Sequence, residues 1–260
     1  MSRLVTFVTL LTLLLAGCDQ EAMLEKFVPK EEAALARELV AKIAARDFAA
    51  VEARLDSKLK LTDLHANLEA MSDLLPDTEP KAVRTIGAHT VASSSATTYN
   101  LTFEYEYPET WIVANVMLER RNEQLTLQSI YFTPYEQSLT TLNRFTFSGK
   151  GIAHYVVLVL VVAVPLFVIY ALVACARTRI PKRKWLWLLF IAVGFVQLEF
   201  NWTTGAWDLA PLSFLLLGAG FFKAGPAAPY IFSLAVPVGA GVFLARRRSL
   251  RQASETQAVG

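Results

Sequence analysis

Hydrophobic and polar positions divide the chain into three stretches with different periods. The first 17 residues and most positions after Gly151 are strongly apolar, whereas residues 19–150 carry most of the charge. In the middle stretch, apolar positions first repeat at helical spacing and then alternate with polar ones, which is the spacing of strands. The pattern therefore predicts an α+β domain between two apolar regions.

Three helices are expected in the first half of the middle stretch, over residues 29–46, 48–55 and 62–75. Proline suits the first turn of the first helix, Asp47 can cap the second, and Pro76 stops the third. In the third helix the apolar positions fall at spacings of four, three and four, so they share one face.

Four strands are expected next, over residues 83–91, 99–107, 111–119 and 125–133. In the second of them aromatic and aliphatic residues alternate with polar ones, which predicts one core-facing and one solvent-facing side. Glu104 and Glu106 fall on the polar side, and we expect them to be solvated rather than to act as a carboxylate pair. Three helices followed by a four-stranded antiparallel meander give an α+β order.

The segment Ala45–Val51, with the sequence ARDFAAV, is similar to the helix break of the nuclear-transport-factor-two-like (cystatin-like cone) superfamily. This resemblance implies that residues 29–135 form helices that close a curved sheet into a cone. Many members of that superfamily are ligand-binding or interaction modules. Others are isomerases or dehydratases that use a pocket acid or histidine, and no position here matches such a residue.

The N-terminus has a short apolar run that ends in Leu15-Ala16-Gly17-Cys18. This ending resembles the lipobox of bacterial lipoproteins, which implies that residues 1–17 are a cleaved signal peptide and that Cys18 is lipidated. The alternative is an ordinary signal peptide or an uncleaved anchor. Asp19 after the cysteine implies retention in the inner membrane, with residues 18–28 as a tether.

The last stretch is predicted to be an all-α membrane domain that follows a linker at 136–150. Three spans are expected, at 151–176, 185–202 and 229–245, with a re-entrant or interfacial segment at 209–222. The number of three spans follows from the positions of the basic clusters. It places both the basic loop at 177–184 and the arginine-rich tail at 246–260 in the cytoplasm, as the positive-inside tendency requires.

Charge separates the same regions. Residues 19–150 hold 20 acidic and 14 basic residues, a net charge of −6, whereas residues 151–260 hold 3 acidic and 10 basic residues, a net charge of +7. Most of the basic residues lie in two short clusters beside apolar runs, which indicates membrane orientation and not nucleic-acid binding. Cys175 lies in an apolar run, and we expect it to be a packing residue.

Candidate catalytic chemistry is sparse. The histidines His65, His89 and His154 have no metal-ligand spacing, and the sequence has neither a glycine-rich phosphate loop nor a nucleophile elbow. His65 is expected at a solvated boundary, and His89 could face the cone interior. No cofactor, metal or catalytic group is predicted, and the protein is not expected to be an enzyme.

A polar site is predicted at the outer end of the second expected span, where an ionisable group is costly without a partner. Glu199 and Asn201 lie there, and Lys223 or His154 could pair with the carboxylate. The site could bind a polar ligand, an ion or a partner helix. The alternative is a carboxylate that reaches water at the membrane interface.

These patterns predict a lipoprotein of the bacterial inner membrane, with residues 19–150 outside the cytoplasm. We expect a non-enzymatic binding or accessory module whose outward domain engages a ligand or an envelope partner. Its expected partners are membrane lipids and either a membrane protein or further copies of the chain, but no nucleic acid. The alternatives are a small transporter or channel subunit that uses Glu199, and an envelope hydrolase or isomerase that uses the cone pocket.

Overall fold

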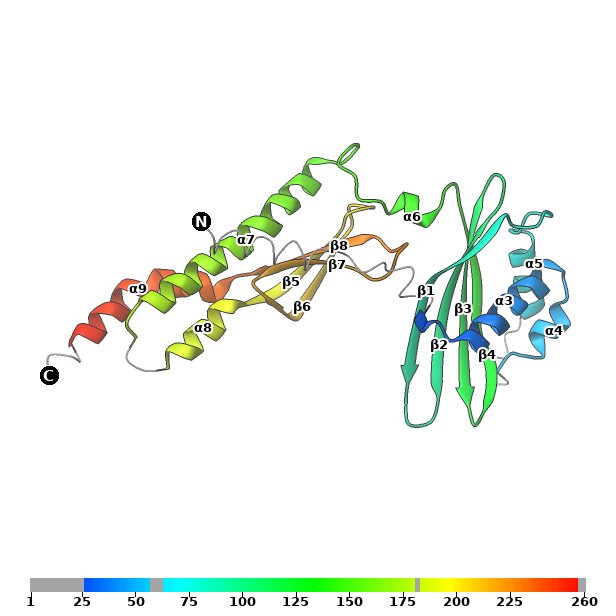
Figure 1. The fold of residues 1–260 in the computed structure, drawn as a ribbon, viewed down its shortest axis with the longest axis horizontal. Coiled ribbons are helices and arrows are strands. Elements are labelled where there is room, and N and C mark those ends of the chain that lie inside the picture. Colours follow the sequence, from blue (N-terminus) through cyan, green and yellow to red (C-terminus); the bar gives the residue numbers. More distant parts are fainter. Residues whose placement is uncertain (1–25, 57–62, 181–182, 257–260) are drawn as a thin grey trace. The chain divides into compact units, whose positions relative to one another are not determined.

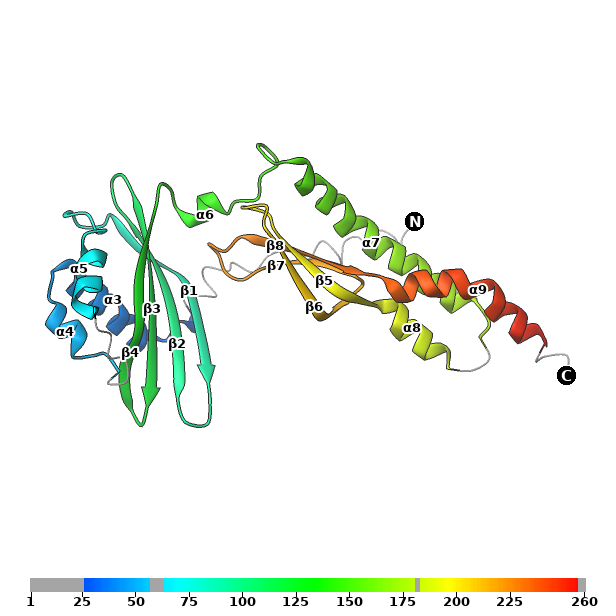
Figure 2. The same ribbon diagram turned by 180° about the vertical axis from the view of Figure 1, so that it is seen from behind.

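The computed structural model describes residues 26–56, 63–180 and 183–256. The predicted signal peptide and Cys18 lie outside these residues. The chain divides into two compact units (Figures 1 and 2). The first unit comprises the residues up to Leu142 together with 225–227, and the second comprises 143–224 together with the residues from Ala228 onward.

The first unit begins with helices α3 (Lys30–Ala44), α4 (Phe48–Glu52) and α5 (Leu64–Ser72). They lie where the apolar spacing predicts them. Pro29 precedes α3 as its N-cap residue, and the Asp47 carboxylate accepts a hydrogen bond from the Ala50 N–H at the start of α4.

An antiparallel meander of four strands follows, in the order β1-β2-β3-β4. The strands are β1 (Ala82–Ala92), β2 (Thr97–Glu106), β3 (Trp111–Arg121) and β4 (Gln124–Tyr135). The three helices lie on one face of this sheet (Figure 1). Fully buried side chains from both layers, among them Ile43, Phe103 and Leu118, form the core between them.

Glu104 on β2 corrects one expectation. It is only 2% exposed, and its Oε2 accepts a hydrogen bond from the Leu139 N–H at 2.7 Å, at the start of the short helix α6 (Leu139–Leu142). The segment after β4 therefore covers the part of the sheet face that alternation predicts to be solvated. Strand alternation separates the two faces of a sheet, but it does not show whether a later segment covers one of them.

The second unit contains three helices and a second antiparallel sheet, with strand order β6-β5-β8-β7. Its elements are α7 (Ile152–Arg177), α8 (Lys184–Ala192), β5 (Val193–Asn201), β6 (Trp207–Leu216), β7 (Ala219–Lys223), β8 (Tyr230–Val236) and α9 (Val238–Thr256). Among the described residues, α7 alone is long and apolar enough to cross a membrane.

The prediction of an all-α domain with three spans is therefore wrong. The expected span at 185–202 is the nine-residue helix α8 followed by strand β5. The expected re-entrant segment at 209–222 lies in β6 and β7, and the expected span at 229–245 is divided between β8 and α9.

Two signals explain the error. Short apolar runs fit a buried strand as well as a helix. In β5 the polar residues Gln197, Glu199 and Asn201 alternate with apolar ones, and this period of two marks a strand with one polar face.

Helix α7 packs against the other elements of the second unit along one narrow stripe. Near its start, Val157 packs with Phe200 and Phe232 of the sheet, and near its end Cys175 packs with Phe243 of α9. Cys175 is thus buried as a packing residue, in agreement with the sequence. The rest of α7 is exposed: only 17% of its most apolar 18-residue window is buried.

Candidate functional site

An apolar pocket lies between α5 and the outer strand β4 of the first unit. Its volume is about 410 Å³, within the usual range of small-molecule sites. Leu64, Leu68 and Met71 line it from α5, and Leu127 and Ile130 line it from β4. The helix residues are four and three positions apart, so they point to one side of α5, which is the face that the sequence predicts to be apolar.

Backbone contacts fix the β4 side of the pocket. Leu55, which follows α4 and also lines the pocket, forms a parallel bridge with Leu127. The Asp56 N–H donates to the Leu127 carbonyl at 3.1 Å, and the Leu127 N–H donates to the Arg54 carbonyl at 2.7 Å. These bonds pair backbone groups that an outer strand would otherwise leave open.

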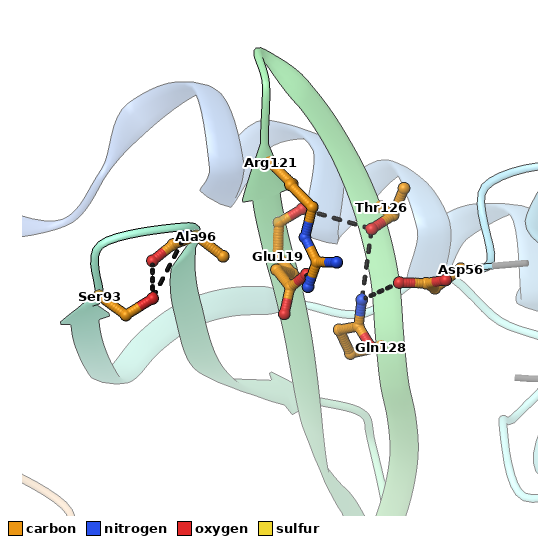
Figure 3. Close-up of polar contacts among 7 residues, drawn as sticks. All are labelled: Asp56, Ser93, Ala96, Glu119, Arg121, Thr126 and Gln128. Atoms are coloured by element: carbon orange, nitrogen blue, oxygen red, sulfur yellow. Dashed lines mark hydrogen bonds and ion pairs between the residues drawn. The ribbon is translucent and has the colours of Figure 1, made fainter. Parts of the chain in front are cut away.

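A short chain of polar side chains borders the pocket (Figure 3). The Gln128 Nε2 donates to Asp56 Oδ2 at 3.0 Å and approaches Thr126 Oγ1 at 3.3 Å. The Thr126 hydroxyl in turn donates to the Glu119 carbonyl at 3.3 Å, and the Arg121 guanidinium pairs with the Glu119 carboxylate. The amide of Gln128 is thereby held in place in the pocket lining.

The lining determines what the pocket can do. Asn67, Gln128 and Ser129 are its polar side chains, and no titratable side chain is among the described lining residues. General acid–base catalysis needs such a group within hydrogen-bond reach of the substrate. The described lining is therefore suited to holding a mainly apolar molecule with a few hydrogen bonds.

The histidines of the first unit do not contribute to this site. His65 is exposed, with its Nδ1 at 3.2 Å from Glu52 Oε1 and its ring edge-on to Phe48. His89 on β1 is exposed, and its neighbour Ala88 packs against the core, so His89 does not face the interior. No group of three or more metal-ligating side chains occurs in the described part of the chain.

Glu199 lies on the polar face of β5, where it belongs to a hydrogen-bond network. The Gln197 Nε2 donates to Glu199 Oε1 at 2.8 Å and to the Ser233 hydroxyl at 3.1 Å. The Ser213 hydroxyl donates to Gln197 Oε1 at 2.6 Å. The printed partner of the Glu199 carboxylate is therefore Gln197 of the same strand, which Ser213 and Ser233 of the neighbouring strands hold in place.

Asn201 lies two residues after Glu199 on the same face of β5, but its side chain has different hydrogen-bond partners. The Asn201 Oδ1 accepts hydrogen bonds from the backbone N–H groups of Thr203 and Thr204 and so organises the turn after β5. The Lys223 ammonium lies over the Tyr230 ring, 5.1 Å from its centroid.

His154, the last of the four, is edge-on to Phe200 and Trp202. Phe200 neighbours Glu199 on β5 and points to the opposite side of the strand, because successive side chains alternate. His154 thus lies on the other side of β5 from Glu199 and Asn201.

The sequence predicts the apolar face of α5 that forms one side of the pocket, but not the β4 side. The helical face of α5 is visible in the spacing of its leucines. The contribution of Leu127 and Gln128 depends on a parallel bridge to a residue 72 positions earlier, and no local pattern encodes such a contact.

No protein-family model, curated protein or solved structure matches this chain.

Proposed function

We propose that this protein is a non-enzymatic, membrane-anchored binding protein whose first unit holds an apolar small molecule in the pocket between α5 and β4. The pocket itself is the observation that carries the proposal, because it has the volume and the mainly apolar lining of a ligand site. The resemblance of residues 29–135 to a superfamily with many ligand-binding members supports the same function.

Helix α7 supports the membrane part of the proposal. Its 26 residues, at about 1.5 Å per residue, are long enough to span a hydrocarbon core of about 30 Å. Its exposed side chains in the central turns, such as Val162 and Leu166, are apolar. Basic residues follow its C-terminus, which favours a cytoplasmic location for that end and an extracytoplasmic one for the first unit. Lipidation of Cys18 would add a second anchor.

The geometry supports the two alternative functions less well. A transporter or channel subunit that uses Glu199 would need polar residues gathered along a path, and His154 lies on the opposite side of β5 from Glu199. A hydrolase or isomerase would need a titratable group in the pocket, and the described lining has none.

Photolabelling of the full-length chain in lipid nanodiscs tests the proposed pocket. The probe is a twelve-carbon fatty acid with a diazirine, and the labelled peptides are mapped by mass spectrometry. We expect saturable labelling of residues 64–74 and 127–130. Ala70 is exposed and lines the pocket, so Ala70→Phe should obstruct it and reduce this labelling at least about tenfold, the effect of about 1.4 kcal/mol of lost binding.

Ala66→Phe is the matched control. Ala66 is one turn earlier on the same helix and exposed, but it is not among the lining residues. It should leave the labelling unchanged. Equal labelling of both variants, or labelling that does not saturate, would refute the proposed pocket.

A further inference from the structure

Two basic segments of the second unit that are far apart in the sequence meet at the C-terminal end of α7. The Arg247 Nε donates to the Thr178 hydroxyl at 3.2 Å, and Thr178 is itself buried and donates to the Ala174 carbonyl. Below this contact Phe243 packs against Cys175. The start of the segment after α7 and the middle of α9 are therefore held side by side.

This junction gathers seven basic side chains, which we call the basic cluster: Arg177, Arg179, Arg183, Lys184, Arg246, Arg247 and Arg248. Lys184 donates to the Ala176 carbonyl and so neutralises part of the negative end of α7. The guanidinium groups of Arg177, Arg179, Arg183, Arg246 and Arg248 are exposed.

The positive charge of this cluster is not neutralised by acidic side chains of the described residues. No ion pair to any of its members occurs within the described part of the chain. The acidic residues of the second unit are Glu199 and Asp208, on the sheet, and Glu255, near the end of α9. Gathering this many like charges costs free energy unless an anion is bound among them.

Two adjacent features identify the class of anion. The cluster lies at the end of an apolar helix of membrane-spanning length, and Trp185, Leu186 and Leu189 beside it on α8 are exposed. Tryptophan next to basic residues is typical of a membrane–water interface. Guanidinium groups bind phosphate oxygens in pairs, and clustered basic residues next to a spanning helix attract anionic lipids.

We propose that the basic cluster binds the phosphate-bearing headgroups of anionic phospholipids at the cytoplasmic surface of the membrane. This inference rests on the proposed function, because it requires α7 to be in a bilayer. It adds a specific lipid class to an anchor that would otherwise depend on hydrophobic contact alone.

Lipid selectivity tests the inference. The full-length chain in mild detergent is titrated with phosphatidylglycerol or phosphatidylcholine, and bound lipid is counted by native mass spectrometry. We expect wild type to prefer phosphatidylglycerol. Replacing the exposed Arg179, Arg246 and Arg248 by glutamine should weaken phosphatidylglycerol binding on the order of 100-fold and leave phosphatidylcholine binding unchanged.

Two further variants and one competitor sharpen the result. Replacing the same three arginines by lysine keeps the charge and should retain most of the preference. Replacing Lys30, Arg54 and Lys81 of the first unit by glutamine removes the same charge elsewhere and should change nothing. Inorganic phosphate at the same concentration should not displace the lipid, and displacement would show a site for free phosphate instead.

Carbonate extraction of membranes that contain each variant separates the two proposals. If the chain stays in the membrane fraction but shows no lipid preference, the lipid-headgroup inference is wrong and the anchor stands. If wild type is released from the membrane, the anchor itself is wrong.

Discussion

Among single residues, Glu32 and Arg120 form the ion pair that joins the first helix to the sheet. The Arg120 guanidinium contacts Glu32 Oε1 at 2.9 Å and Glu31 Oε2 at 3.0 Å, and Glu32 is only 7% exposed. Burial alone would raise the pKa of Glu32, but hydrogen bonds from its own backbone, from Arg120 and from Tyr99 outweigh it and lower the pKa below its usual value.

Replacing Glu32 by glutamine should therefore destabilise the first unit in a pH-dependent way. At pH 7 we expect a loss of about 1.5–3 kcal/mol of unfolding free energy, typical of a hydrogen bond to a charged group. Because the pKa is lower in the folded state, this contribution is present above the unfolded-state pKa and disappears as the pH falls through the folded-state value.

Urea titrations at pH 7 and pH 3 measure this loss of unfolding free energy. Hydrogen exchange of the β2 and β3 amides measures it at the sheet. Glu38→Gln, on an exposed position of the same helix, is the control and should have little effect. The same loss for Glu32→Gln at both pH values would contradict the assigned role.

A buried phenol in the same core shows a different balance. Burial raises the pKa of Tyr105, and its hydroxyl has no hydrogen-bond partner within the described structure. Such a group costs free energy that the surrounding apolar contacts must offset. The cone interior implied by the superfamily resemblance is thus occupied at this point by a packed core.

At the scale of elements, α7 combines a narrow packed stripe with a wide apolar surface. Val162 and Leu166 are 58% and 61% exposed, so changes there leave the packing of the second unit intact. In a bilayer, each arginine at mid-helix costs about 2.5–3.5 kcal/mol. In water the same change would be almost neutral.

The corresponding prediction combines both anchors. Cys18→Ser should abolish fatty-acid labelling but leave the chain in the membrane pellet after carbonate extraction, because α7 still holds it. Adding Val162→Arg and Leu166→Arg should move most of the chain to the supernatant. Ile152→Arg, at the exposed first position of α7, is the control and should not. A triple variant that stayed in the pellet would refute the anchoring role of α7.

The elements also show which information the sequence carries. The amphipathic helices and alternating strands of residues 29–135 were predictable, because each shows its period locally. The second unit was not, since its strands are short and mostly apolar and differ from helices only in sparse signals such as the alternation around Glu199. Within the predicted polar site, the strand period keeps Glu199 and Asn201 on one face of β5, whereas His154 packs on Phe200 of the opposite face.

Helices α8 and α9 of the second unit approach each other closely at one glycine. A Cβ at Gly239 on α9 would overlap the Phe190 carbonyl oxygen of α8, so the two helices meet at backbone distance there. At Gly241, two residues later on the same helix, a Cβ would meet nothing within 4 Å. Only the packing partner defines the role of Gly239.

For the whole molecule, the division into two units has an energetic consequence. The core of the first unit includes Phe103, and a separate core at the α7–α9 contact includes Phe243. Both phenylalanines are completely buried, and truncating such a side chain costs about 3–5 kcal/mol.

Differential scanning calorimetry of the full-length chain in detergent should resolve two transitions. Phe103→Ala should lower one midpoint by about 10 °C or more, and Phe243→Ala should lower the other. If either variant shifted both transitions equally, the units would unfold as one, and the division would have no thermodynamic meaning.

The strand order of the second sheet has one further consequence. Strands β6 and β7 each have only one hydrogen-bonded neighbour in the described sheet, and in β6 the exposed Pro211 lies where the pairing is irregular. An outer strand left open is a template for cross-molecule pairing, and it cannot rest against lipid tails. Without a partner to cover these edges, the purified protein should therefore form β-rich aggregates. Aggregation, and not unfolding, should then limit the conditions in which the protein can be handled.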